Sequence, residues 1–212
     1  MNKSTFLVIE GNIGAGKTSL TKLLANKLNA RTILERFKDN PFLPKFYQDP
    51  ERYAFQVETS FLIDRYWQLK DEIFDARELF TNMIIADYYF PKSIIFAKKT
   101  LKDDEFRLFR NIFDIIYKNI PKPDLYVYLH LKPENLLENI RKRGREYERN
   151  ITAEYLKKIE KSYFEFFKEE KNIPFLIIDT NNLDFVHNKK DFDTIYQIIF
   201  AKNYPIGITI VE

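Results

Sequence analysis

Short, continuous apolar runs recur along the chain, separated by longer segments in which apolar residues return every three or four positions. Each run has the length of a β-strand and ends at an acidic or turn residue, which is typical of strands buried on both faces. We expect strands at residues 6–9, 32–34, 83–86, 125–131 and 175–178, with residues 206–211 as a candidate edge strand. The longer segments predict helices at about residues 17–28, 53–73, 90–101, 104–120, 133–143, 153–170 and 191–201.

Strands that alternate with helices predict an α/β fold, in which a parallel sheet of about five strands is flanked by helices. In such sheets, ligands bind outside the carboxyl ends of the strands. The first candidates for chemistry are therefore residues 10–18, Glu35, Asp87 and Asp179, which follow the predicted strands. The length of 212 residues suits a single domain over residues 1–212.

One motif specifies the ligand. The run Gly11-Asn12-Ile13-Gly14-Ala15-Gly16-Lys17-Thr18 matches G-x-x-x-x-G-K-[ST] in full, between a predicted strand and a predicted helix. Glycines let the loop turn its backbone N–H groups toward phosphate oxygens, and the helix adds its positive end. We therefore predict a P-loop NTPase-type site for ATP and Mg²⁺, formed by Gly11, Asn12, Ile13, Gly14, Ala15, Gly16, Lys17, Thr18 and Ser19.

Two aspartates are candidates for ordering the metal with the Thr18 hydroxyl. Asp87 closes the apolar run at residues 83–86, and Asp179 closes the run at residues 175–178. We prefer Asp87, because kinases of this type usually place an early strand beside the P-loop. The structural alternative for either residue is a strand-end or helix-capping carboxylate.

Five basic residues surround Gly144 between two predicted helices: Arg141, Lys142, Arg143, Arg145 and Arg149. A solvated charge run is the structural alternative. Phosphoryl transfer, however, spreads negative charge over the transferred group, and arginines that close over it supply bidentate donors and exclude water. We therefore predict an arginine-rich lid at about residues 141–150.

Composition and spacing exclude several other classes. The net charge of +3 is small for a nucleic-acid binder, no apolar run is long enough to span a membrane, and the apolar start before Glu10 is too short for a secretory signal. We expect a cytoplasmic protein with no nucleic-acid or membrane partner. Asn188-Lys189-Lys190-Asp191 spells the guanine-reading N-K-x-D of switch GTPases, but it does not follow a predicted strand directly, and no glycine has an aspartate three positions before it.

Taken together, these features resemble the deoxynucleoside kinase family, most closely its bacterial branch that acts on deoxyadenosine and deoxyguanosine. The resemblance runs from about residue 6 to 186 and rests on residues 10–18, 40–43 with 46–47, 53–56, 95–97 and 143–148. It implies ATP-dependent phosphorylation of the 5′-hydroxyl of a purine deoxynucleoside, in nucleotide salvage. Family members are commonly homodimers.

The resemblance also assigns roles on the acceptor side. Glu35 matches the general base for the 5′-hydroxyl, and Gln56 matches the amide that pairs with the base edge. Phe55 and Phe96 match aromatic residues that stack on the base. Without the resemblance, Glu35 reads as a surface acid and both phenylalanines as core.

Further roles concern the sugar and the nucleotide donor. Tyr47 and Glu148 correspond to the pair that holds the sugar 3′-hydroxyl, and Arg143 and Arg145 correspond to catalytic lid arginines. Asp179 begins the loop that borders the adenine of ATP.

The sequence departs from the family pattern after the third predicted strand, where many members carry acid-Arg-Ser. This chain has Ala86-Asp87-Tyr88-Tyr89, so the arginine is missing. One alignment puts Asp87 in the place of the arginine, beside the substrate, and a slip of one residue restores the acid but not the arginine. Lys92 is a candidate for the missing cation. The arginine and aspartate that read cytosine are also not evident, with Ile63 and roughly Lys92 at those places, which disfavours a deoxycytidine enzyme.

Three alternatives stay open. A broad-specificity deoxynucleoside kinase would use the same residues. A thymidylate-type nucleoside monophosphate kinase would need arginines for the acceptor's own phosphate, for which Arg65 and Arg36 are candidates. The third alternative is a non-enzymatic nucleotide-binding module, which only the missing arginine favours.

Overall fold

A single parallel sheet forms the centre of the computed structural model, which describes residues 5–36, 40–74 and 83–211. The strands of this part of the chain are β1 (Thr5–Gly11), β2 (Arg31–Ile33), β3 (Met83–Ala86), β4 (Leu125–His130), β5 (Pro174–Asp179) and β6 (Gly207–Val211). Their order in the sheet is β2-β3-β1-β4-β5-β6, and every pair is parallel. The five expected strands are confirmed, and the candidate edge strand is the sixth.

Helices connect these strands. They are α1 (Lys17–Leu28), α2 (Leu43–Gln48), α3 (Pro50–Leu69) with a π-helical turn at Lys70–Phe74, α4 (Lys92–Thr100), α5 (Asp103–Tyr117), α6 (Pro133–Arg143), α7 (Ala153–Glu169) and α8 (Lys189–Phe200). The predicted helices are confirmed to within about three residues. The short helix α2 was not expected. Asp49 follows its last residue, and the Asp49 side chain caps α3 by accepting a hydrogen bond from the Arg52 amide at 3.3 Å.

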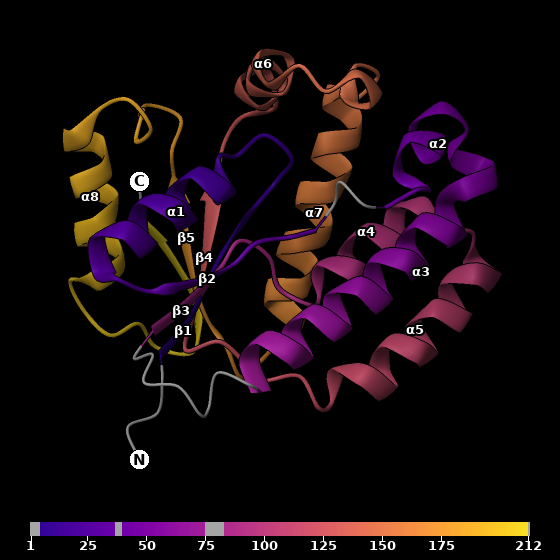
Figure 1. The fold of residues 1–212 in the computed structure, drawn as a ribbon, viewed down its shortest axis with the longest axis horizontal. Helices are drawn as coiled ribbons and strands as arrows, with labels where there is room; N and C mark the ends of the chain where they lie inside the picture. The colour runs from indigo at the N-terminus through magenta and orange to yellow at the C-terminus, as the bar shows by residue number, and fades with distance from the viewer. Residues whose placement is uncertain (1–4, 37–39, 75–82, 212) are drawn as a thin grey trace.

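Alternate residues of β1 face two different apolar layers. Phe6 and Val8 join the cluster built with α3, α4, α5 and α7, whereas Leu7 and Ile9 join the cluster built with α1, α6 and α8. Figure 1 shows α1 and α8 on one side of the sheet, α3, α4, α5 and α7 on the other, and α6 above it. Burial on both faces explains why the strands are continuously apolar in sequence.

The strand order fixes where chemistry occurs. β1 lies between β3 and β4, so the loops after β1 and β3 leave the same edge of the sheet side by side. The loop between α6 and α7 lies above this edge in Figure 1. Over the ranges that the structure describes, no helix has the length and apolarity needed to cross a membrane.

Candidate active site

The P-loop leads from the end of β1 into α1. Gly16 caps the helix with a left-handed φ of 84°, and a Cβ at this position would lie 2.7 Å from the Phe185 ring. The Lys17 ammonium donates to the carbonyl oxygens of Gly11 at 3.0 Å and Asn12 at 2.9 Å. Lys17 is therefore held across the loop at the helix N-terminus, where an anionic phosphate would bind.

Asn12 has a structural part in this loop. Its buried side chain donates to the Leu156 carbonyl on α7 at 2.8 Å and accepts from the Ile13 amide at 2.9 Å. These bonds fix the first half of the P-loop to a helix that is distant in sequence. The Asn12 side chain therefore stabilises the shape of the loop.

Thr18 and Asp87 are in contact, as expected, because the neighbouring strands β1 and β3 lead into the segments that carry them. The Thr18 hydroxyl donates to one Asp87 carboxylate oxygen, and the other oxygen accepts from the Glu35 amide at 2.7 Å. Burial raises the pKa of Asp87 above its ordinary value. A hydroxyl and a carboxylate suit Mg²⁺, which takes oxygen ligands from one or two carboxylates and from substrate phosphates.

Asp179 has a different environment. Its carboxylate accepts from the backbone amide of Asn181 at 2.8 Å and from the Asn181 side chain at 2.6 Å. It therefore shapes the loop after β5, whose residues 180–187 help to line the nucleotide-side cavity described below.

Glu35 is paired with two cations. Its Oε2 lies 2.6 Å from the Lys92 ammonium, and its Oε1 lies 2.6 Å from Nη2 of Arg65. Burial opposes the charge on Glu35, but Lys92 and Arg65 outweigh burial and hold the pKa of this carboxyl well below its usual range. Lys92, the candidate for the missing cation, therefore lies next to Glu35.

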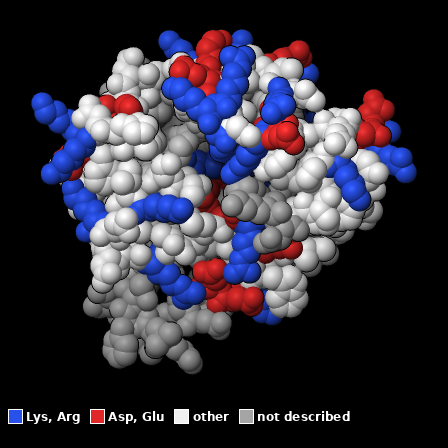
Figure 2. Space-filling model, turned by 45° about the horizontal axis from the view of Figure 1, so that its top comes forward, with Lys and Arg blue, Asp and Glu red and all other residues white. Residues whose placement is uncertain are grey.

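Two cavities meet at these residues. One lies toward α2, α3 and α4, and we call it the acceptor cavity; the other lies between the P-loop, α6 and the loop after β5, and we call it the donor cavity. Both are lined by Lys17, Thr18, Glu35, Asp87, Arg143 and Arg145. Figure 2 shows Lys and Arg side chains around a hollow on this side of the molecule, with acidic side chains inside it.

The predicted lid segment supplies basic residues to this junction. Glu148 is buried and accepts from Arg143 Nη2 at 2.5 Å and from Arg145 Nη1 at 3.1 Å. Tyr147 in the same segment stacks on Tyr47, with ring centroids 5.8 Å apart. Tyr47 and Glu148 both line the acceptor cavity, and burial raises the pKa of Tyr47, which keeps its hydroxyl protonated.

The residues that face the acceptor cavity from α3 differ from the expected ones. Gln56 is exposed, and Phe55 packs against the core cluster rather than lining the cavity. The lining residues of this helix include Glu58, Phe61 and Arg65, spaced by three and four positions on one helical face. Two residues turn a helix by about 200°, so Gln56 and Glu58 point in nearly opposite directions.

The same shift of two residues along α3 corrects the expectation for Ile63. Ile63, placed by the sequence where the family reads cytosine with an arginine, is 48% exposed. Arg65 is buried in the cavity instead, where it also donates to the Ser93 hydroxyl at 2.8 Å. The apparent absence of an arginine therefore gives no argument against cytosine.

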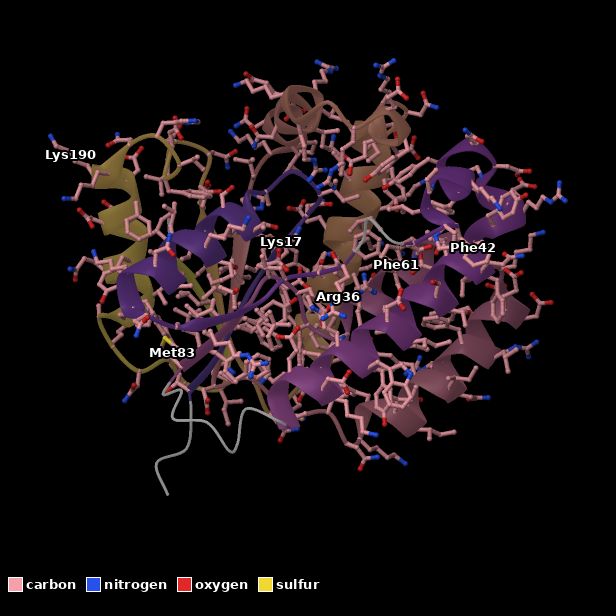
Figure 3. All side chains as sticks on the ribbon, viewed as in Figure 1. Lys17, Arg36, Phe42, Phe61, Met83 and Lys190 are labelled. Carbon is pink, nitrogen blue, oxygen red and sulfur yellow. The ribbon has the colours of Figure 1, made fainter. Side chains whose placement is uncertain are left out.

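Phe96 lines the acceptor cavity as expected, and Phe61 lines it from α3. Figure 3 labels Phe61 on α3 and Lys17 at the start of α1, which are two of the elements around the junction. Phe61 and Glu58 were not predicted from the sequence, although the charges of Glu58 and Arg65, seven positions apart on one face of a helix with apolar residues, mark that face.

Asn188 and Asp191 of the N-K-x-D run have a structural explanation. The Asn188 side chain accepts from the Lys190 amide at 3.0 Å and caps α8, and Asp191 accepts from the Asp184 amide at 2.8 Å. The run is a helix start, which agrees with its exclusion as a guanine-reading loop.

Comparison with known proteins identifies the family. Residues 7–203 match the family described as deoxynucleoside kinase. The chain is 37% identical to the deoxyguanosine kinase of Bacillus subtilis, covering 92% of this chain and 96% of that protein. It is 31% identical to the deoxyadenosine kinase of Lactobacillus acidophilus, covering 95% and 97%.

A solved structure agrees with this result. Deoxyadenosine kinase from M. mycoides with bound dATP superposes with a TM-score of 0.78 at 26% identity, covering 92% of this chain and 99% of that one. Together with a sheet that places a full P-loop beside two joined cavities, these matches show that the chain belongs to the deoxynucleoside kinase family.

Proposed function

We propose that this protein transfers the γ-phosphoryl group of ATP to the 5′-hydroxyl of a purine deoxynucleoside. The observation that carries the proposal is the meeting of two cavities at Lys17, Glu35 and the lid arginines. A phosphoryl donor and an acceptor have to approach each other in line, and two cavities with one shared junction allow this. The two relatives named above are a deoxyguanosine kinase and a deoxyadenosine kinase, which supports the acceptor class.

ATP binds in the donor cavity. Its phosphates lie against the P-loop amides and Lys17, and its base lies toward the loop at residues 180–187. Thr18 and Asp87 would hold Mg²⁺, which would supply positive charge to neutralise the phosphates. Burial, together with nearby Lys92, lowers the pKa of Lys17 to about 8, so bound phosphate also stabilises the charge of this lysine.

The acceptor binds in the other cavity with its 5′-oxygen at Glu35. This oxygen forms a bond to the γ-phosphorus as the bond from phosphorus to the bridging oxygen of ADP breaks. The hydroxyl proton passes to Glu35, and the products are ADP and the deoxynucleoside monophosphate. Arg143 and Arg145 stabilise the negative charge on the transferred group.

The low pKa of Glu35 limits how it assists this step. A carboxylate held by two cations is a weak base, but a loose phosphoryl-transfer transition state removes the hydroxyl proton late and needs little base strength. Glu35 therefore orients the 5′-hydroxyl and receives its proton as the new bond forms. Lys92 and Arg65 hold the carboxylate in position for this.

The sugar and the lid complete the acceptor site. The protonated Tyr47 hydroxyl and the Glu148 carboxylate offer a donor and an acceptor to the 3′-hydroxyl. Because Glu148 also binds both lid arginines, the sugar and the transferred phosphoryl group are linked through one carboxylate. For the whole protein, we propose a cytoplasmic homodimer.

The monophosphate-kinase alternative would need arginines for the acceptor's phosphate. Arg65 is bound to Glu35, and Arg36 lies 3.4 Å from Glu72. Using either would require breaking an ion pair with a carboxylate. Offering monophosphates as acceptors tests this alternative directly.

The variant Glu35→Gln tests the proposed function. It should lower kcat by about 100-fold or more, while the Kd for MgATP changes less than about twofold. Glu160→Gln is the matched control, because Glu160 pairs with His130 at 2.9 Å outside both cavities. Full turnover in Glu35→Gln would contradict the proposal.

A further inference from the structure

Glu58 is a buried acid that the proposed reaction does not use. It lies on α3 in the wall of the acceptor cavity, with its side chain only 4% exposed. One of its oxygens is 2.8 Å from the Thr100 hydroxyl, the last residue of α4. Among the described residues, no lysine or arginine forms an ion pair with it, since nearby Arg65 and Lys92 are both paired with Glu35.

The groups around Glu58 leave its charge only partly compensated. Lys92 from α4 and Arg65 from its own helix favour the charge, whereas Glu35 after β2 opposes it, and Tyr47 from α2 and Tyr155 from α7 also face it. Burial is the largest effect and raises the pKa of Glu58 to about 7.

A buried acid without a fixed cation lowers stability, so packing alone does not explain Glu58. The Thr100 hydroxyl has one proton and lies between Glu58 and the Phe96 carbonyl oxygen, at 2.8 and 3.2 Å. Each carboxylate oxygen has two lone pairs, so the carboxylate keeps free acceptor positions. These positions are available to a ligand in the acceptor cavity.

The edges of the two purines differ in what they offer such a group. Guanine presents two adjacent donors, N1–H and the N2 amino group, whereas adenine presents the N1 acceptor beside the N6 amino donor. The ionised carboxylate only accepts hydrogen bonds, so it matches guanine and faces the adenine N1 with a lone pair; the two guanine donors in turn favour the ionised form. A glutamine at the same place would donate and accept, which matches adenine.

We propose that Glu58 reads the acceptor base and selects guanine over adenine by accepting hydrogen bonds from N1–H and the N2 amino group. This inference rests on the proposed function and deepens it. Phe61 and Phe96 line the same cavity and provide apolar surface for the faces of the base. The two guanine donors then replace the hydrogen bonds from water that Glu58 loses by being buried.

The test compares kcat/KM for deoxyguanosine, 2′-deoxyinosine and deoxyadenosine in the wild type and in Glu58→Gln at about pH 8, above the Glu58 pKa of about 7. The wild type should prefer deoxyguanosine, and the ratio of deoxyguanosine to deoxyadenosine should fall about 10- to 100-fold in the variant. Deoxyinosine lacks the N2 amino group. It should be a poorer substrate than deoxyguanosine for the wild type, and the variant should lose most of that difference.

Gln56→Ala is the matched control, because Gln56 is exposed on the same helix and should leave both ratios unchanged. A wild type that prefers deoxyadenosine, or a variant that loses activity equally with both purines, would overturn the inference while the proposed function stands. A wild type with no turnover on any deoxynucleoside would overturn the proposed function and the inference with it. A melting curve of Glu58→Gln confirms that any change is measured on folded protein.

Discussion

Two acids and two cations lie close together in the acceptor cavity, and both cations pair with the same acid. Glu35 holds both cations, Lys92 and Arg65, and its pKa is well below the usual range. Glu58 has neither cation, and its pKa is about 7. The neighbours of these two carboxylates thus move their pKa values in opposite directions, as is typical of sites with divided roles.

Lys92→Met tests the role of the cation beside Glu35. Loss of the ammonium leaves Glu35 held by Arg65 alone, so its position should be less fixed and its pKa should rise. We expect kcat to fall about 10- to 1,000-fold, with the Kd for MgATP changed less than about twofold. Stopped-time assays of monophosphate formation and titration calorimetry measure the two quantities.

Lys98→Met is the control for that measurement. Lys98 also lies on α4, but it pairs with Glu165 at 2.8 Å at the surface. Its loss should leave kcat unchanged. Equal kcat values for Lys92→Met and the wild type would remove Lys92 from the site.

Glu58→Gln should also change how stability depends on pH. The folded-state pKa of Glu58, about 7, lies above the ordinary 4.5, so the folded protein binds more protons than the unfolded chain between these values. The contribution of Glu58 to stability is therefore largest below pH 4.5 and is lost as the pH rises through 7. Glutamine does not titrate, so the variant should gain up to about 3 kcal/mol relative to the wild type from pH 4.5 to pH 8.

Urea unfolding of both proteins at a series of pH values measures this difference. The variant's relative stability should increase steadily with pH. Parallel stability curves for the two proteins would show that Glu58 titrates normally in the fold.

At the scale of elements, α3 shows what the sequence predicts and what it does not. Its existence follows from the apolar spacing, but the residues that face the acceptor cavity depend on the helical phase. The motif at residues 53–56 pointed to Phe55 and Gln56, whereas the cavity is lined by Glu58, Phe61 and Arg65. An offset of two residues reverses the face of a helix, so a correct element gave an incorrect set of contacts.

The P-loop was predictable at the level of single residues, because its contacts are local. Lys17 and Thr18 hold their places through the loop and the start of α1, and Asp87 follows from the strand order. The ion pairs of Glu35 with Arg65 and Lys92 join three segments separated in sequence by about 30 and 57 residues. No local pattern contains that information.

Gly16→Ala tests the junction between β1 and α1. The residue has a left-handed φ of 84°, and the new Cβ would lie 2.7 Å from the Phe185 ring. Backbone strain and this overlap should together cost at least about 2 kcal/mol and weaken ATP binding, because the amides at the start of α1 move. Urea unfolding and nucleotide titration measure the two effects.

Gly144→Ala is the matched variant. Gly144 also has a left-handed φ, 72°, but a Cβ there would meet no atom within 4 Å. It should cost only about 1 kcal/mol and leave ATP affinity unchanged. Equal losses in both variants would mean that contact with Phe185 has no part in the effect.

At the scale of the whole molecule, the two apolar layers account for the position of the site. The helices on each side of the sheet bury its faces, and the carboxyl ends of β1 and β3 remain open to the two cavities. The order of strands and helices in sequence predicted this arrangement, because a parallel sheet with helical connections has few ways to form. It did not predict oligomeric state.

The proposed homodimer is testable on the outer surfaces of α3 and α5, which contact each other. Trp67 on α3 is 51% exposed and Ile115 on α5 is 70% exposed. The double variant Trp67→Glu, Ile115→Glu should be monomeric by light scattering if these helices pair two chains, because buried unpaired charges oppose association. Ile210→Glu, an exposed position on β6, is the control. A double variant with the mass of the wild-type dimer, or a monomeric wild type, would contradict this interface.

The most direct test of the central claim is product formation from MgATP with each deoxynucleoside and each deoxynucleoside monophosphate offered separately. Lys17→Ala serves as the blank, because it removes the ammonium that spans the P-loop. We predict ADP and a deoxynucleoside monophosphate from deoxyguanosine or deoxyadenosine, and no product from the blank. Turnover with monophosphates alone, or the absence of turnover with every acceptor, would contradict the assignment of the joined cavities to phosphorylation of a purine deoxynucleoside.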